Sequence, residues 1–327
     1  MWILIIPPLL GVMFVAALLL LLWRRYRAAL ALTVLGLLLN HASQTIALHP
    51  FTSTLSDRKA ELSGIRILEY NVWGMGPYLK EHDRQPATAL VTMIDSMHPD
   101  VVVLPEYNSV FSRSLGDTLM THYPWNTKSQ MGSPDRGEVQ VYSRYPVSNL
   151  RRFWLANDSV YTDPKDETYW TRVWWMDLDV DGRMVKLVYV HLKSNEYTRA
   201  RRKSAHWIDG IRDYWEGLSV GYEERIKQAV AIRDSLLLWN GPALVAGDFN
   251  DLSGSDVLRT IQDAGLSDAW WKAGFGYGFT YDSYHLYLRL DHVLFSDHFQ
   301  VAGAKVISGY DFSDHDPLLV DLRFGDK

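Results

Sequence analysis

The sequence predicts an α/β domain of short buried strands and helices, preceded by an apolar N-terminal segment. Two observations predict the domain. Short apolar runs stop at polar residues, as in the stretch 243–252 (ALVAGDFNDL), and such runs are typical of buried strands. Between these runs, residues 86–97 and 222–239 carry apolar side chains at helical spacing. A third observation, the apolar character of most of the first 48 residues, predicts a membrane segment.

The composition is that of a globular protein, and it excludes some functions. Of the 327 residues, 47% are hydrophobic and 22% are charged. The net charge of −5 argues against a protein whose affinity rests on an overall basic surface. The chain has no cysteine, which excludes disulfides, thiolate nucleophiles and cysteine-ligated zinc.

Two apolar runs form the N-terminal segment. Residues 1–23 have no charged side chain and are long enough to cross a bilayer, and residues 28–48 are just long enough. The arginines between the runs are expected to stay cytoplasmic, so residues 1–48 predict a transmembrane helical hairpin, followed by a linker at 49–63. The hairpin predicts a protein of the inner (plasma) membrane in which a catalytic domain, residues 64–327, is periplasmic or extracytoplasmic. The alternatives are a single span, which would leave this domain cytoplasmic, and a cleaved signal peptide, against which the missing basic start and cleavage site argue.

The elements of the large domain follow from periodicity and turn residues. The first expected helix, 86–97, has a proline at its start, which favours a helix there. Asp181-Gly182 predicts a hairpin turn. A segment at 269–288, rich in aromatic residues and glycine, is expected to be a long loop. The expected strands are 65–70, 101–104, 138–143, 172–180, 184–190, 243–247, 289–296, 304–308 and 317–322, and the expected helices are 86–97, 111–121, 195–217, 222–239 and 255–264.

Polar residues with catalytic chemistry follow most of these strands. One such residue alone is more often a turn former or a satisfied edge residue than a ligand or base. Six coincidences in one domain favour a site made of carboxylates, amides and histidines, which can hold hard divalent cations and provide general bases or phosphate donors. The combination favours metal-assisted hydrolysis of a phosphate ester. The residues are Asn71, Glu106, His191, Asp248 with Asn250, Asp291 with His292, and Asp314 with His315.

These strand ends lie in stretches that resemble the endonuclease/exonuclease/phosphatase superfamily, whose members are similar to deoxyribonuclease I. The stretches are in family order and cover about residues 64–325. The resemblance implies a four-layer α/β/β/α sandwich with the site at one edge. The stretches are EYNVWG at 69–74, PDVVVLPEYN at 99–108, YSRYPV at 142–147, VYVHLKSN at 188–195, VAGDFNDL at 245–252, LRLDHVLFS at 288–296 and SDHDPLLVDL at 313–322.

The resemblance implies a metal site. It makes Glu106 the principal ligand of Mg²⁺, or of Mn²⁺ or Ca²⁺ in its place, with Asn71 beside it. Asp314 would complete the metal or phosphate end of the site. No other cofactor is implied.

The resemblance also implies catalytic roles. Asp248 would orient or deprotonate the attacking water, Asn250 would bind the phosphate, and His191 would donate to a phosphate oxygen or the leaving group. His315 would contact the scissile phosphate as a base or transition-state stabiliser, and Asp291 would pair with it. Two further positions are Glu138, expected to orient His191, and His292, expected to be structural because neighbours in a strand face opposite ways.

The substrate class stays open between a nucleic acid and a phospholipid headgroup. A basic cluster at 199–203 favours an endonuclease, or is a solvated helix face. The predicted membrane anchor and the aromatic loop favour a phospholipid or sphingomyelin phosphodiesterase or a lipid phosphatase, although the loop is more simply a cap on the sheet edge. A non-catalytic scaffold of the same fold is a minor alternative. No obligate protein partner is indicated.

Overall fold

The computed structural model describes most of the domain and part of the N-terminal segment. It describes residues 15–19, 21, 23, 25–49, 64–73, 86–107, 118–127, 139–152, 172–195, 207–283 and 286–325. Four predicted features lie wholly or mostly outside these residues: the linker predicted at 49–63, apart from its first residue, most of the helix predicted at 111–121, Glu138, and the basic cluster at 199–203.

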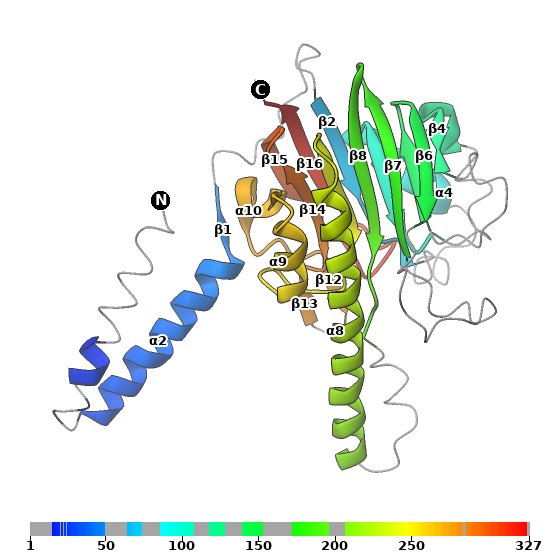
Figure 1. Cartoon of the computed structure of the whole chain (residues 1–327). Helices are drawn as coiled ribbons and strands as arrows, with labels where there is room; N and C mark the ends of the chain where they lie inside the picture. The colour runs from blue at the N-terminus through cyan, green and yellow to red at the C-terminus, as the bar shows by residue number, and fades with distance from the viewer. Residues whose placement is uncertain are drawn as a thin grey trace.

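Two six-stranded sheets form the centre of the described structure (Figure 1). In spatial order, the first sheet consists of β15 (Phe299–Val306), β16 (Leu318–Phe324), β2 (Gly64–Glu69), β3 (Val101–Pro105), β5 (Val139–Ser143) and β4 (Trp125–Asn126). The second consists of β10 (Leu266–Asp268), β14 (Asp291–Ser296), β9 (Ala243–Asp248), β8 (Arg183–His191), β7 (Arg172–Val180) and β6 (Val147–Arg152).

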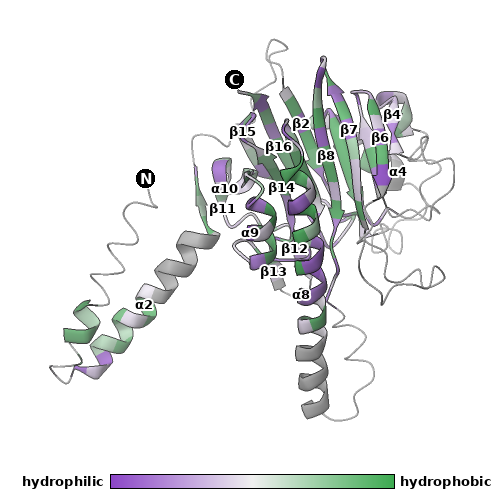
Figure 2. Cartoon of the chain, in the orientation of Figure 1, coloured by the Kyte–Doolittle hydropathy of each residue, from purple (hydrophilic) through white to green (hydrophobic). Residues whose placement is uncertain are grey.

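Three apolar clusters divide the domain into layers. One cluster fills the space between the sheets and includes Ile67 and Val320 of the first sheet and Leu187 of the second. A second joins the first sheet to α4 (Pro86–Met97), and a third joins the second sheet to α8 (Trp207–Leu237) and α9 (Asp256–Gln262). The apolar strand segments appear green in Figure 2. The predicted α/β/β/α sandwich is therefore confirmed for the described residues.

The strand pairing brings the polar strand ends to one edge. β2 pairs with β3, and β8 with β9, in parallel, while their other neighbours in the sheets are antiparallel. The parallel strands therefore end where antiparallel β14 begins, and Asp291 lies opposite Asp248 in the register. Gly247 permits close approach of β9 to β8: it has φ +143°, and a Cβ there would lie 1.8 Å from the carbonyl oxygen of Val190. A larger residue would separate the strands that end at His191 and Asp248.

Three regions differ from the expectations. Where separate helices were predicted at 195–217 and 222–239, the described residues form one helix, α8, from Trp207 to Leu237, and residues 196–206 lie outside the described part of the chain. Gly221 lets this helix lie close to Asn195, since a Cβ at residue 221 would be 2.7 Å from Asn195 Oδ1. The predicted loop at 269–288 instead contains α10 (Ala269–Ala273), β11 (Phe275–Gly276), β12 (Tyr281–Ser283) and β13 (Leu286–Leu288). Strands β6 and β10 were not predicted, because β6 is polar and β10 is only three residues long.

The N-terminal segment contains α2 (Tyr26–Thr45), which projects away from the sandwich and leads into β1 (Ala47–Leu48) (Figure 1). β1 pairs with β11 of the main domain. The helix coincides with much of the second predicted span, whereas most of the first span lies outside the described residues. Within the part of the chain that the structure describes, we find no helix that is both long and apolar enough to span a membrane.

Candidate active site

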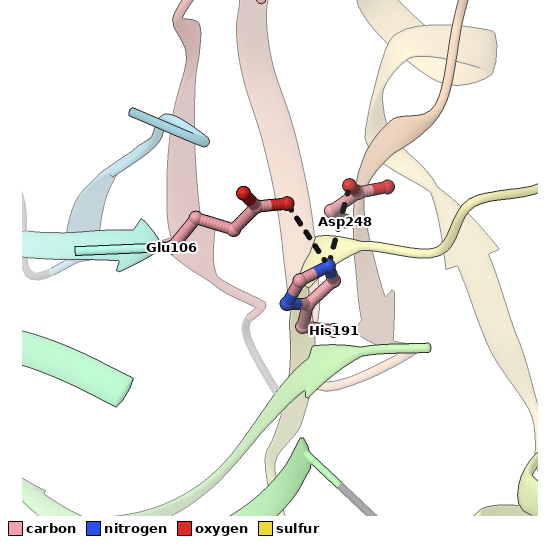
Figure 3. A group of neighbouring side chains, drawn as sticks. All are labelled: Glu106, His191 and Asp248. Atoms are coloured by element: carbon pink, nitrogen blue, oxygen red, sulfur yellow. Dashed lines mark ion pairs between the residues drawn. The ribbon is translucent and has the colours of Figure 1, made fainter. Parts of the chain in front are cut away.

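Glu106, His191 and Asp248 meet at the edge where β3, β8 and β9 end (Figure 3). The Nε2 atom of His191 lies 3.4 Å from Glu106 Oε1 and 3.9 Å from Asp248 Oδ2. His191 and Asp248 are buried, while a third of the Glu106 side chain is exposed. The backbone of Glu106 has φ +54°, which residues with a Cβ rarely adopt and which is common at functional sites. The first sheet thus contributes an accessible carboxylate to a buried pair from the second.

Asn71 connects the two carboxylates through its amide. Its Nδ2 donates to Glu106 Oε1 at 3.3 Å and to Asp248 Oδ2 at 3.0 Å, while its Oδ1 accepts from the backbone N–H of Trp73. In this orientation the amide presents N–H groups, not its oxygen, to the carboxylates. Asn71 lies where the sequence predicted it, and a metal-ligand role requires its amide to rotate.

Asn250 holds Asp248 from the other side. The backbone N–H of Asn250 donates to Asp248 Oδ1 at 2.7 Å, and its side-chain amide donates to Leu192 O at 3.1 Å. Burial, together with the charge of Asp291, raises the pKa of Asp248 to about 7, although the charge of His315 and the Asn250 N–H oppose the shift. A carboxylate with this pKa is suited to accept a proton near neutral pH.

His315 and Asp291 form a buried pair beside this group. His315 Nδ1 lies 2.7 Å from Asp291 Oδ2, and Asp291 is completely buried. Burial lowers the pKa of His315, but the charge and hydrogen bond of Asp291, with the charges of Asp248 and Asp314, raise it to about 10. The imidazole is therefore protonated at neutral pH and acts as a hydrogen-bond donor. Of the two roles expected for His315, this favours the stabiliser over the base.

Two further residues were predicted for the site, Asp314 and Glu138. Asp314 is half-buried, and among the described residues it does not belong to either group of acidic and histidine side chains close enough to share an ion. Its backbone oxygen accepts from Asp282 N and so ties the segment before β16 to β12. Glu138 lies outside the part of the chain that the structure describes. The metal role of Asp314 and the orienting role of Glu138 stay predictions.

His292 has the structural role expected for it. Its ring is fully buried, with Nδ1 3.1 Å from Asp268 Oδ2 and Nε2 3.1 Å from Asp251 O. Asp268 also accepts from Arg289 Nη1 at 2.9 Å. Burial opposes ionisation of Asp268, but Arg289 and the hydrogen bonds from His292 and Trp271 hold its pKa well below the usual range. This network links the start of β14 to its two neighbours in the sheet, β10 and the segment that follows β9.

Sequence reasoning missed two neighbours of the Asp291–His315 pair. The Tyr281 ring packs edge-on against the His315 ring with centroids 5.0 Å apart, because the predicted loop folds back as β12. Glu69, the last residue of β2, is completely buried, and burial, with the charges of Asp291 and Asp248, raises its pKa well above the usual value. The signal for Glu69 was available: it shares the inward phase of Ile65 and Ile67 along the strand.

The donors present fit a divalent metal ion. The ligand atoms of Glu106, His191 and Asp248 lie within 4.8 Å of one another, as do those of Asp248, Asp291 and His315. The first group is the more accessible, because Glu106 is partly exposed, whereas all three residues of the second are buried and His315 Nδ1 already binds Asp291. Carboxylate oxygens are the ligands that hard divalent cations prefer.

Comparison with known proteins places the chain in a family. The model of the Endonuclease/Exonuclease/phosphatase family matches residues 68–315, and the chain belongs to this family. Members are metal-dependent phosphoesterases, and this protein is accordingly a metal-dependent hydrolase of phosphate esters. None of the curated protein sequences compared with the chain matches it.

Solved structures share the fold. A family protein from Bacteroides thetaiotaomicron has 17% identity and a TM-score of 0.61, with 81% of this chain and 99% of that one covered. D. rerio TDP2 complexed with single-strand DNA product has 16% identity and a TM-score of 0.54, with 80% and 99% covered. Sphingomyelinase C from Streptomyces griseocarneus has 18% identity and a TM-score of 0.53, with 79% and 99% covered. At these identities the likeness concerns the fold alone.

Proposed function

We propose that the protein is a Mg²⁺-dependent phosphodiesterase, and that its substrate is a nucleic acid that it cleaves as an endonuclease. The observation that carries the proposal is the meeting of Glu106, His191 and Asp248 with the Asp291–His315 pair at one sandwich edge. One accessible carboxylate, one buried acid with a pKa of about 7 and one protonated imidazole are the groups that in-line attack of water on a phosphodiester requires.

Glu106 would hold the metal ion, with Asp248 and, after rotation of its amide, Asn71 nearby. The bound ion would neutralise charge that develops on the phosphate. Oxygen ligands favour Mg²⁺, and Mn²⁺ and Ca²⁺ are the alternatives.

The protein's own groups would move and hold the protons. Asp248, oriented by the backbone N–H of Asn250, accepts the proton of the attacking water. His315 uses Nδ1 to bind Asp291, so its Nε2 is the ring nitrogen that donates to a phosphate oxygen. His191 is placed to stabilise the same phosphate or the leaving oxygen. No covalent intermediate is required.

An assay on two substrate classes tests the proposal. The full-length protein is incubated with supercoiled DNA in Mg²⁺ or EDTA, beside Asp248→Asn, which keeps the size of the side chain. We expect nicking in Mg²⁺ alone and none by the variant. In parallel, vesicles of phosphatidylcholine and sphingomyelin are assayed for released phosphorylated headgroup. Headgroup release without nicking would contradict the endonuclease and support the second candidate.

The second candidate is a phospholipid or sphingomyelin phosphodiesterase, or a lipid phosphatase, and exposed aromatic rings favour it. Tyr277 and Phe279 are each 40% exposed and stack with centroids 5.1 Å apart, and Tyr287 lies 5.9 Å from Phe279. Phe279 is two residues from Tyr281, whose ring contacts His315. Aromatic rings beside a catalytic centre suit the interface of a bilayer. Trp270, by contrast, is buried in the core between the sheets.

Attachment to the inner membrane, with the catalytic domain outside the cytoplasm, stays part of the proposal. Large apolar side chains are exposed on the N-terminal segment, among them Leu18, Trp23, Leu30 and Leu35. Such exposed apolar surface favours contact with a membrane or a protein. Fractionation of cells that produce the full chain, followed by protease treatment of intact spheroplasts, tests it: digestion of the domain supports the proposed side, and protection contradicts it.

A further inference from the structure

Arg225 is a buried cation that the proposed reaction does not use. It lies in α8, and only 5% of the residue is exposed. Its Nε donates to Asp251 Oδ2 at 2.8 Å, and its Nη1 donates to Lys193 O and to Asn195 Oδ1, each at 2.9 Å. Burying a guanidinium is costly unless acceptors surround it, and the planar fork of arginine fits acceptors in fixed directions. These acceptors therefore hold the Arg225 side chain in one place.

The acceptors of Arg225 belong to the two segments that follow the strands of the active site. Lys193 lies two residues after His191, and Asp251 lies three residues after Asp248. The strands that end at His191 and Asp248 are β8 and β9, which pair in parallel, so both segments leave the sheet at the same end. One side chain of α8 thus joins the two segments.

Gln228 adds a second contact from the same face of α8. It is buried, and its Oε1 accepts from the backbone N–H of Lys193 at 3.0 Å, so side chains of α8 bind both backbone groups of Lys193. Gly221, one turn before Arg225, leaves room for this approach. A Cβ at residue 221 would lie 2.7 Å from Asn195 Oδ1 and 3.1 Å from Arg225 Nη1. Glycine weakens the interior of a helix, and the helix has one where these contacts need the space.

The joined segments hold the groups around Asp248. The backbone N–H of Leu192 donates to Asp248 O at 2.9 Å, and its backbone oxygen accepts from Asn250 Nδ2 at 3.1 Å. Asn250, whose N–H donates to Asp248 Oδ1, has φ +50°, a conformation that persists where the surrounding contacts impose it. Asp251 is the next residue, so its ion pair with the arginine of α8 restrains the backbone directly after this strained position.

We propose that Arg225 is a positioning residue, which joins the segments after β8 and β9 and thereby keeps the N–H of Asn250 on the Asp248 carboxylate. The side chain touches neither Asp248 nor His191 in the described contacts, and it acts through Asp251 and Lys193. The consequence for catalysis rests on the proposed function, whereas the joining of the two segments does not.

The kinetic test compares two substitutions of Arg225 in the full-length protein, with bis(p-nitrophenyl) phosphate as the substrate. Arg225→Met keeps an unbranched stem but has no donor, so kcat falls on the order of 100-fold while KM stays within about threefold, as small misplacements of catalytic groups cause. Arg225→Lys keeps the charge and a donor but not the fork, so it recovers about tenfold of this loss. Arg233→Met, which removes an ion pair with Asp234 on the same helix, is the matched control and leaves kcat unchanged.

Hydrogen–deuterium exchange, measured by mass spectrometry, gives a second readout that does not depend on activity. The reporters are the backbone N–H groups of Lys193 and Asn250. Peptides that contain residues 192–195 and 249–252 should exchange on the order of tenfold faster in Arg225→Met, and at the parent rate in Arg233→Met. Peptides from β14 verify the fold, and Arg225→Gln replaces the Met variant if the latter does not fold.

The two readouts separate a failure of this proposal from a failure of the proposed function. Unchanged exchange in the two segments, or parental kcat in Arg225→Met, would overturn the positioning role. Equally fast exchange in Arg233→Met would also overturn it, because the effect would then belong to the helix as a whole. A parent that hydrolyses no phosphate ester but shows the expected exchange would contradict the proposed function and support the joining of the two segments.

Discussion

Removing the charge of Asp291 should take away much of the positive charge that His315 carries at neutral pH. The pKa of His315 is raised from 6.5 to about 10, and the charge and hydrogen bond of Asp291 are the largest causes that raise it. A shift of this size corresponds to roughly 5 kcal/mol in favour of the protonated ring. Asp291→Asn removes both contributions while burial, which lowers the pKa, remains. We therefore expect the His315 pKa to fall by several units and the ring to lose much of its charge at pH 7.5.

The assay is an NMR titration of the histidine side chains combined with steady-state kinetics. The variant should hydrolyse its substrate on the order of 1,000-fold more slowly, by analogy with acids that orient catalytic histidines. Asp282→Asn makes the same chemical change at an exposed acid of β12 and serves as the control. A His315 pKa that stays near 10 in Asp291→Asn would refute the claim that Asp291 is what keeps His315 protonated.

Three further predictions follow from the site. The rate should depend on pH as a bell, rising through about 7 as Asp248 loses its proton and falling near 10 as His315 loses its own, with the bound metal moving the lower limb to lower pH. Glu106→Gln should weaken the apparent Mg²⁺ affinity about tenfold or more in calorimetry, while the exposed Glu223→Gln leaves it unchanged. Gly247→Ala places a methyl group 1.8 Å from a backbone oxygen of β8 and should cost several kcal/mol in urea unfolding; wild-type stability would contradict that contact.

The order of the elements and the polar strand ends were predictable because they are local. Each of these buried strands is a continuous apolar run in the sequence. The polar residue at its end, such as Glu106 or Asp248, marks where the strand stops. Parallel pairing brings the ends of β2 and β3 together in one sheet and the ends of β8 and β9 together in the other. The packing of the two sheets, which is not local, then brings Glu106 to His191 and Asp248. The structure adds the orientation of each side chain, as in the amide of Asn71.

What the sequence did not predict depends on distant contacts. Separate helices were expected at 195–217 and 222–239, but α8 continues through residue 221, where the lack of a side chain lets the helix lie close to Asn195. The aromatic segment resembled a loop, but β12 pairs with β13 and forms a bridge from Tyr281 to His315.

Hydrolysis of bis(p-nitrophenyl) phosphate most directly tests the central claim, which is metal-dependent attack on a phosphodiester at this edge. The full-length protein is assayed in Mg²⁺ and in EDTA beside Asp248→Asn, with Asp263→Asn, an exposed acid at the end of α9, as the matched control. The account predicts p-nitrophenolate release by the parent and the control in Mg²⁺ only, and a loss of about 1,000-fold or more in Asp248→Asn. Undiminished hydrolysis by Asp248→Asn, or by the parent in EDTA, would contradict it.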